Sequence, residues 1–512
     1  MLPKHISTSK NYEDFLDAEF NNLPASVRER LLHDEELKHM RRQMISFRPE
    51  FAQEIIASCY SKTGRRGMDP VIIIRSLLLM LAYGCLSITK WVRKVKADIA
   101  LQFLIGFWKI PSIGSHYDLI NRILGIEPHM DDLYSKGKKP RPGKKTTKSS
   151  AKGRKKRRKN NKRNNYYENG EKVNYDEHKT RDLAQKYSKN PNCDRNRLTR
   201  KLEQIFDLLV VRPSCEYFSI LEEEDLTLSG DGTALPAHSC PYGHKVKKPV
   251  DEQHSYRYTA PDADWGKDSY KRMWYYGYAL YTICYHKRGL DLPLFLEKHP
   301  ASRHDALPMI TATAHMLDVN PSLKPRNMAL DAAGDGGPNH EFLITLGMRP
   351  IIKRNGRFKT PDKVDLPKAK TAPDGTKEHF NKDGVPVCMA NCPMRRNGYD
   401  KKLKAYMYRC PRATGKLKTS CPHEAECNKT PYGRVLRVPD QTNVRLFGQI
   451  PYNSRYWRAL YKNRTSCERI NKRILKDYHL ENVMCRSGDK LLFFAMLAGI
   501  LIHLDAWIKI GR

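Results

Sequence analysis

The chain has 512 residues, too many for one small core, so we expect several domains or one domain with large insertions. Its 92 lysine and arginine residues against 56 acidic residues give a net charge of +36, which favours a polyanionic partner such as nucleic acid. The N-terminal MLPKHISTSKNYEDF lacks the apolar core of a signal peptide, which argues against an exported protein.

Residues 1–130 are predicted to form a helical domain. Its most apolar stretch, VIIIRSLLLMLAYGCLSI, follows Asp69 and Pro70, a pair typical of a helix N-cap and the first helical position. Because Arg75 lies inside this stretch, we predict a buried core helix and no membrane span. The segment PSIGSHYDLINRIL predicts a turn followed by another helix. Binding of DNA ends and plain packing or dimerisation are both compatible with such a domain.

Residues 131–182 are predicted to be a basic linker. Within it, residues 136–163, KGKKPRPGKKTTKSSAKGRKKRRKNNKR, contain no acid and almost no apolar side chain. This segment buries too little apolar surface to offset the entropy of ordering, so we expect it to be disordered when free. A run this basic binds DNA phosphates without sequence preference through counterion release. We therefore interpret it as a tether to DNA rather than as a solubilising linker.

A second folded unit is predicted to cover residues 183–354. It opens with NRLTRKLEQIFDLLVV, which has a helical pattern. Runs of strand length and helical runs then follow in the order three strands, helix, strand, helix, strand. The strands are LTLSGDGTALP, MWYYGYALYTICYH, LPLFLEKHP, RNMALDAAGD and MRPIIKR, and the helices are RHDALPMITATAHMLD and PNHEFLITLG.

Two of these strands are expected to end at an aspartate. Asp231 follows LTLSG on the first strand, and Asp331 follows NMAL on the fourth. This order, with a further acid on a later helix, is the layout of the RNase H-like fold, an α/β fold whose mixed sheet is flanked by helices. Its first and fourth strands are neighbours, so we expect the two aspartates to lie side by side. Either aspartate taken alone is more often a turn former or a helix cap.

Residues 355–455 are not needed for this core and are predicted to be a Cys-rich insertion, a possible zinc ribbon. The segment VCMANCPMRRNGYDKKLKAYMYRCPRATGKLKTSCPHEAEC contains five cysteines and one histidine. The spacings are looser than paired CxxC motifs, but so many thiols in a loop-rich cytoplasmic segment favour Zn²⁺ over free thiols. The expected ligands are Cys392, Cys410, Cys421 and Cys427, with Cys388 or His423 as substitutes.

The last predicted unit, residues 456–512, contains two helices. The first carries Tyr461, Arg464, Glu468 and Lys472, which at about 100° per residue stay within about 40° of one line on a helix. Ordinary ion pairing on an exposed helix face accounts for the same spacing. The second, LLFFAMLAGILIHLDAWI, is interrupted by a histidine and an aspartate, so we predict another core helix and no membrane span.

Three carboxylates, from two strand ends and one helix, suit a pair of divalent cations. Asp231, Asp331 and Glu468 supply one each, and their hard oxygen atoms favour Mg²⁺ or Mn²⁺. Such a pair activates a water or a 3′-hydroxyl and stabilises the leaving oxygen during attack on a phosphodiester. The acids that compete for these places are Glu224 and Asp225 before the first strand, Asp335 one turn after the fourth, and Glu481 after the glutamate helix.

With these segments in place, the sequence resembles bacterial-type insertion-sequence transposases of the DDE class. It is most similar to those with a Tyr-x2-Arg-x3-Glu-x6-Lys signature, which Tyr461, Arg464 and Glu468 match in spacing. SGDGTALPAHS, YYGYALYT, ALDAAGD and RPIIKRN also match, as does IIIRSLLLMLAYGCLS before the core. The resemblance covers roughly residues 65–125 and 225–505.

The resemblance implies that the three acids bind the metal pair and that Tyr461 and Arg464 contact phosphates beside the scissile bond. The signature lysine falls on Leu475, so its role passes to Lys472 or Lys476. The implied activity is cleavage at terminal inverted repeats and joining of 3′-ends to target DNA, by a homodimer or larger assembly in a prokaryotic cytoplasm, at the nucleoid. An inactive or domesticated DNA-binding derivative and a metal-dependent nuclease with the same core are the alternatives.

Overall fold

The structure is a computed structural model of the chain. It describes every residue except 4, 127–164, 169–170, 243, 248–253, 258–259, 269–270, 288, 304–305, 357–365, 367–368, 382, 414, 416–419, 428–431, 441–443, 484 and 512. The predicted basic tether, residues 136–163, therefore lies outside the described residues.

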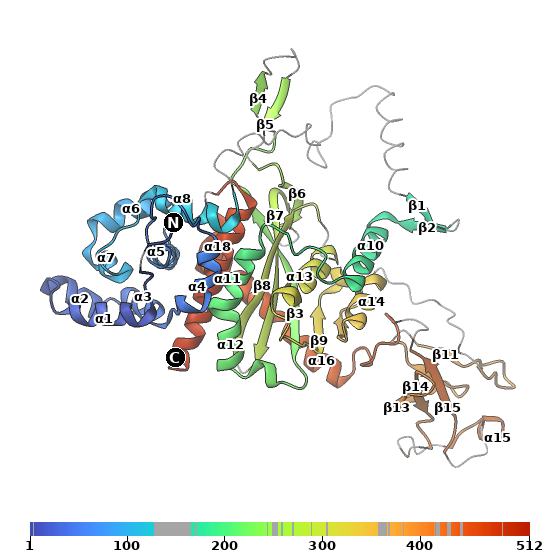
Figure 1. Cartoon of the computed structure of the whole chain (residues 1–512). Coiled ribbons are helices and arrows are strands. Elements are labelled where there is room, and N and C mark those ends of the chain that lie inside the picture. Colours follow the sequence, from blue (N-terminus) through green and yellow to red (C-terminus); the bar gives the residue numbers. More distant parts are fainter. Residues whose placement is uncertain are drawn as a thin grey trace.

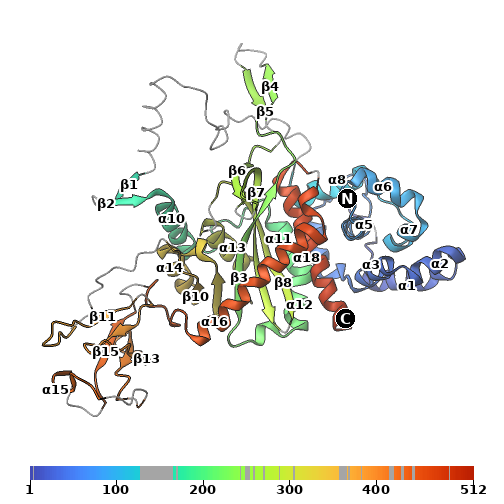
Figure 2. The same ribbon diagram turned by 180° about the vertical axis from the view of Figure 1, so that it is seen from behind.

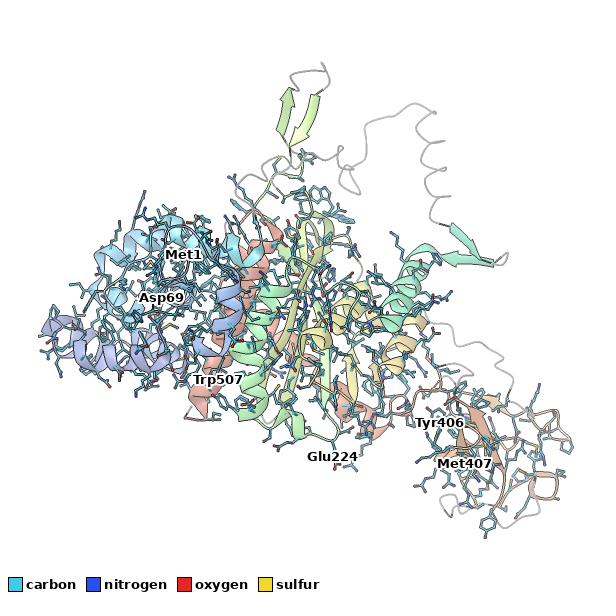
Figure 3. All side chains as sticks on the ribbon, in the orientation of Figure 1. Met1, Asp69, Glu224, Tyr406, Met407 and Trp507 are labelled. Atoms are coloured by element: carbon cyan, nitrogen blue, oxygen red, sulfur yellow. The ribbon has the colours of Figure 1, made fainter. Side chains whose placement is uncertain are left out.

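The N-terminal part is helical, as predicted. Its helices are α1 (Ser9–Phe20), α2 (Ala25–His33), α3 (Glu35–Ser46), α4 (Gln53–Ser58), α5 (Pro70–Ala82), α6 (Ile88–Ala97), α7 (Ile99–Ile105) and α8 (Ile113–Leu124). Asp69 caps α5 by accepting a 2.9 Å hydrogen bond from the Val71 amide, and Figure 3 shows it inside this helical region, near Met1. Arg75 is buried within α5 and lies 3.7 Å from the centre of the Tyr12 ring. The predicted cap and core helix are both confirmed.

A mixed sheet forms the centre of the molecule (Figure 1). Its strands run in the order β10-β9-β3-β7-β6, and β8 pairs with β7. Their bounds are β3 (Thr227–Pro236), β6 (Asp264–Asp268), β7 (Met273–Lys287), β8 (Leu290–Pro300), β9 (Asn327–Leu330) and β10 (Arg349–Ile352), with α13 (Ala306–Val319) and α14 (Gly337–Thr345) between the later strands. This confirms the predicted order and the neighbouring first and fourth strands, and adds the edge strand β6.

The first core strand is longer than predicted. It pairs in parallel with β9 from Thr227 to Gly230 and in antiparallel with β7 from Leu228 to Pro236. The prediction that the strand ends at Asp231 is therefore wrong, because β7 continues to pair with β3 after β9 has ended. Asp231 lies at the point where the parallel partner stops.

Further helices and two hairpins surround the sheet. These are α10 (Tyr175–Lys189), α11 (Arg200–Phe206), α12 (Arg212–Tyr217), the hairpin of β1 (Asn165–Glu168) and β2 (Glu171–Asn174), and the hairpin of β4 (His244–Lys247) and β5 (His254–Arg257). The helix α10 begins before the predicted end of the linker at residue 182, and it buries Ala184 and Tyr187 while it packs against α13 and α14. The predicted linker is thus too long at its C-terminal end.

The helix α18 (Gly488–Lys509) connects the helical region to the sheet. It packs against β8 and against α3, α5 and α8, so one continuous hydrophobic core includes both regions. By length and composition α18 could cross a membrane, but 89% of its most apolar window is buried inside the protein. The predicted core helix is confirmed.

The insertion forms a small unit with its own core. It contains β11 (His379–Phe380), β12 (Pro386–Val387), β13 (Arg395–Asp400), β14 (Ala405–Arg409), α15 (Glu424–Cys427) and β15 (Val435–Pro439). The strands β13, β14 and β15 form a sheet, and Figures 1 and 2 show it to one side of the central sheet. Arg445 ties the insertion to the core, because its guanidinium donates to both carboxylate oxygens of Asp335 at 2.7 and 2.6 Å.

Candidate active site

The register of two parallel strands makes Asp231 and Asp331 neighbours. The last pair of the β3–β9 ladder is Gly230 with Leu330, and one aspartate directly follows each. Ser229 points to the helix behind the sheet, where its hydroxyl lies 2.9 Å from that of Ser466. Side chains two apart on a strand share a face, so Asp231 points the same way.

The two aspartates line one small cavity. The other lining residues are Gly230, Gly232, Tyr281, Leu330 and Gly334. Glycine at position 230 leaves room for Tyr281, because a Cβ atom there would lie 2.5 Å from the Tyr281 hydroxyl oxygen and would displace it. Asp331 also caps the short 3-10 helix Ala332–Gly334 by accepting a 2.9 Å hydrogen bond from the Ala333 amide. Asp331 is therefore a helix cap, as an aspartate after a strand often is, and this hydrogen bond fixes its side chain at the cavity.

The third acid comes from a composite helix. It consists of α16 (Arg455–Tyr461), a 3-10 turn (Lys462–Arg464), α17 (Thr465–Lys472) and a π-helical turn (Arg473–Asp477). The predicted uniform α-helical spacing is thus broken between Tyr461 and Arg464. One face of α17 is fixed on the sheet, where the hydroxyl of Thr282 donates to Asn471 at 2.9 Å. Glu468 lies away from that contact, and 53% of its side chain is exposed.

Arg464 connects two of the three acids. Its guanidinium is hydrogen-bonded to the Glu468 carboxylate, and Nη1 lies 3.9 Å from Oδ1 of Asp231. Burial lowers the pKa of Arg464, but the carboxylates of Asp231 and Glu468 outweigh that effect and raise the pKa overall. The three charges therefore form one electrostatic unit at the rim of the cavity.

Tyr461 lies on the other side of the same site. Its ring stacks on Trp457 with centroids 4.8 Å apart and an interplanar angle of 11°. Burial raises the pKa of the Tyr461 hydroxyl, Asp331 adds to the rise, and Arg464 opposes it. Tyr461 is thus a half-buried helix aromatic that also lies near an aspartate of the cavity.

Two family comparisons agree with this geometry. Residues 227–504 match the family described as Transposase DDE domain, and residues 29–142 match Transposase domain (DUF772). The first match covers more than half of the chain. The chain belongs to the transposase DDE domain family. Together the two matches support an insertion-sequence transposase, and no curated protein matches the chain.

Three of the acids that compete in sequence have structural partners in this transposase, and the fourth, Glu224, is exposed. Asp335 is 1% exposed and, besides Arg445, accepts a 2.6 Å hydrogen bond from the Asn355 amide. Burial raises the pKa of Asp335, but the hydrogen bonds from His340, Arg445 and the Asn355 amide outweigh it and hold the pKa far below its usual value. Asp225, which precedes the first residue of β3, is bonded to Arg349 and Tyr456, and Glu481 pairs with two lysines.

The two candidate lysines lie in different surroundings. Lys476 is in the π-helical turn, and its ammonium group donates to Glu481 at 2.6 Å. Lys472 is exposed at the end of α17 and lines a surface pocket with Arg469, Arg473 and Lys509. Lys472 therefore lies at an open surface pocket of mixed charge, since Asp291 and Asp477 also line it.

No group of three or more His, Cys, Asp or Glu side chains is arranged to hold a metal ion in the part of the chain that the structure describes. Asp231 and Asp331 share a cavity, and Glu468 stands at its rim, bound to Arg464. The donor set is nevertheless three carboxylates, which fits Mg²⁺ or Mn²⁺ and does not fit a soft metal.

Of the residues that line the cavity, sequence reasoning identified only the two aspartates. Tyr281 closes the cavity from β7, and Gly334 lines it from the 3-10 helix. Both lie in segments that resemble the family, YYGYALYT and ALDAAGD, but the sequence of these segments does not indicate which residue lines the cavity of the two aspartates.

Proposed function

We propose that this transposase cuts DNA at the ends of an insertion sequence and joins the 3′-hydroxyl ends to target DNA, with Asp231, Asp331 and Glu468 as its catalytic carboxylates. The observation that carries the proposal is the β3–β9 register, which makes two aspartates neighbours at the end of a parallel ladder. The bond from Arg464 to Glu468, with Asp231 at 3.9 Å from the same guanidinium, supports the third assignment.

The three carboxylates would hold Mg²⁺ or Mn²⁺. Such ions, when bound, supply Lewis-acid activation of the attacking oxygen and charge stabilisation at the leaving oxygen. The protein itself contributes the fixed aspartates, of which Asp331 is held by the Ala333 amide, and the composite helix that carries Glu468.

Arg464 and Tyr461 would bind the phosphates beside the scissile bond. A guanidinium presents a planar fork of donors that matches two phosphate oxygens. A phosphate bound there would compete with Glu468 for Arg464 and release the carboxylate toward the aspartates. Lys472 would contact the DNA backbone next to this point, since it is exposed and lies one turn after Glu468 on α17.

The partners follow from the reaction. They are the terminal inverted repeats of the element and a target DNA, and pairing two ends requires at least two copies of the chain. The net charge of +36 suits such a polyanionic ligand. We place the protein at the nucleoid, in the cytoplasm of a prokaryote.

Substitution of each acid tests the assignment. We expect Asp231→Asn, Asp331→Asn and Glu468→Gln each to abolish cleavage of a donor plasmid that carries the element's ends, because each removes one charged ligand. Binding of the ends, measured by gel shift, should survive, since the basic surface is unchanged. Glu481→Gln is the matched control and should cleave like the wild type, because Glu481 pairs with lysines away from the cavity.

The products separate the alternatives. Joined donor and target strands support the transposase, nicks without joining indicate a nuclease with the same core, and binding without cutting indicates an inactive derivative. Near-normal cleavage by one of the three variants would remove that residue from the triad.

A further inference from the structure

Six potential metal ligands surround one pocket in the insertion, far from the carboxylates. The pocket is lined by Cys388, Cys392, Cys410, Cys421, His423 and Cys427, together with Arg412 and Arg434. These ligand residues come from three separate segments of the insertion, so the fold and not the local sequence brings them together.

A tight turn presents the first two thiols. The Cys388 amide donates to the Cys392 carbonyl at 3.0 Å, and the Asn391 amide donates to the Cys388 carbonyl at 2.8 Å. Asn391 has a φ of +51°, a left-handed conformation that asparagine tolerates better than most residues. The backbone is therefore bent so that both thiols of this Cys-x3-Cys segment reach the same pocket.

Two further thiols are held by backbone hydrogen bonds. Cys410 directly follows β14, and its amide donates to the Arg434 carbonyl at 2.9 Å. Cys427 ends the short helix α15, and its amide donates to the His423 carbonyl at 2.9 Å. Both thiols line the same pocket as those of Cys388 and Cys392.

Arg412 provides an independent indication of negative charge at this pocket. Its Nη2 atom lies 4.0 Å from the sulfur of Cys392. The Nε and Nη1 atoms are buried and have no hydrogen-bond partner among the described residues. Two buried guanidinium nitrogens beside neutral thiols are poorly compensated, whereas four thiolates around a divalent cation carry a net charge of −2 that would offset the charge of Arg412.

The hydrophobic core of the insertion is small. Its buried cluster is made of Leu366, Cys388, Met394, Tyr406, Tyr408, Leu436, Val438, Leu446 and Phe447. Figure 3 shows Tyr406 and Met407 in this unit, apart from Trp507 in the main core. Small units with so few apolar side chains usually need a metal or disulfides. The structure describes all thirteen cysteines and none of them forms a disulfide, so disulfides do not fill this role.

We propose that the insertion binds one structural Zn²⁺ ion through the thiolates of Cys388, Cys392, Cys410 and Cys427. Compared with the ligand set expected from the sequence, Cys388 replaces Cys421, because Cys388 shares a hydrogen-bonded turn with Cys392. His423 faces Asp374 at 3.5 Å. Among the described residues, the thiols line the pocket but are not yet arranged as a metal site. Binding of Zn²⁺ would therefore draw the four sulfur atoms inward, to Zn–S distances of about 2.3 Å.

The test uses the purified full-length chain after dialysis against Mg²⁺. Metal analysis should find about one equivalent of zinc, and replacement by Co²⁺ should give the strong near-ultraviolet absorption of cobalt thiolates. The variants Cys388→Ser and Cys410→Ser should lose the metal. Cys421→Ser and the matched control Cys240→Ser, an exposed cysteine outside the insertion, should each keep one equivalent.

A wild-type protein without zinc, whose five insertion thiols all react freely in the folded state, would overturn the proposal. Retention of zinc by Cys410→Ser would overturn it too, as would loss of zinc from Cys421→Ser with retention in Cys427→Ser. The readout is independent of DNA cleavage, because Asp231→Asn should carry as much zinc as the wild type. A result that contradicts the zinc site therefore does not contradict the proposed carboxylate site, and a result that contradicts the carboxylate site does not contradict the zinc site.

Discussion

Arg464 is the residue on which the electrostatics of the candidate site depend. It faces Asp231 and Glu468 at once, and only 18% of its side chain is exposed. Two carboxylates so close to each other would repel without this cation. The same guanidinium is the group that we propose for phosphate binding, so it serves the free protein and the DNA complex in different ways.

Replacing Arg464 tests that double role. We expect Arg464→Gln to slow cleavage of element ends by about 10²–10³-fold, the usual loss when one preorganised charge-stabilising donor is removed. Arg464→Lys should recover only part of the rate, because lysine keeps the charge without the planar fork. The measurement is single-turnover cleavage, and Arg458→Gln, on the exposed side of α16, is the control. Unchanged cleavage by Arg464→Gln would reduce the contact with Glu468 to a surface ion pair.

Sequence reasoning could choose between neighbouring residues only where the local signal differed between them. Asp331 directly follows a fully buried strand, and this distinguishes it from Asp335 in the sequence alone. The ion pair of Asp335 with Arg445 was not predictable, because Arg445 lies 110 residues away in the sequence, inside the insertion. The lysine of the signature was also ambiguous, since only the fold shows that Lys476 is paired with Glu481.

Among the helices, α18 contains a buried hydrogen-bonded chain that depends on pH. The Trp507 indole donates to the Ser214 hydroxyl at 2.8 Å, that hydroxyl lies 2.7 Å from Nδ1 of His503, and His503 Nε2 lies 2.9 Å from the Pro293 carbonyl. A neutral imidazole satisfies this arrangement by donating from Nε2 and accepting at Nδ1. Burial lowers the pKa of His503 to about 4, and the Pro293 hydrogen bond only partly opposes that shift.

Because His503 has a lower pKa in the folded protein than in the unfolded chain, the free energy of unfolding should decrease as the pH falls. As pH falls, the unfolded chain takes up a proton at His503 near pH 6.5, whereas the folded chain does not until about pH 4. The stability that neutral His503 contributes is therefore complete above pH 6.5 and decreases by up to about 3 kcal/mol toward pH 4. We expect the stability difference between wild type and His503→Asn, measured by urea unfolding, to narrow over this range. A constant difference would contradict the shift, and His33→Asn, at an exposed histidine, should match the wild type throughout.

Most elements of this protein were predictable because their signals are local. Asp69 before Pro70 marks the start of α5, and the apolar run NMAL marks β9. The sequence did not reveal that β3 continues past Asp231, since that depends on the length of its partner β7. The edge strand β6, DWGKD, was missed because it lacks the apolar run of a buried strand. The 3-10 and π-helical turns around α17 were also not predicted, because the spacing of Tyr461, Arg464, Glu468 and Lys472 indicated one continuous α-helix.

At the scale of the whole molecule, positive charge is the property that acts over distance. Deleting residues 136–163 should weaken binding to all DNA sequences alike and flatten its salt dependence, by about 0.9 in the log–log slope for each phosphate that the chain no longer neutralises. Equilibrium binding to element ends and to unrelated DNA at several salt concentrations measures this. A selective loss of end recognition would show instead that the segment reads sequence. Replacing the segment with Gly and Ser residues of equal length is the control for spacing.

The position of α18 also determines when the protein can finish folding. The helix follows in the chain every element that it touches, from α3 to the composite helix that carries Glu468. At about 5–20 residues per second, a ribosome makes α5 and α8 tens of seconds before their partner emerges. The apolar face of the helical domain that α18 will cover therefore stays exposed while most of the remaining chain is synthesised. We expect chains that stop before residue 488 to be degraded rather than to persist as truncated competitors for the ends of the element.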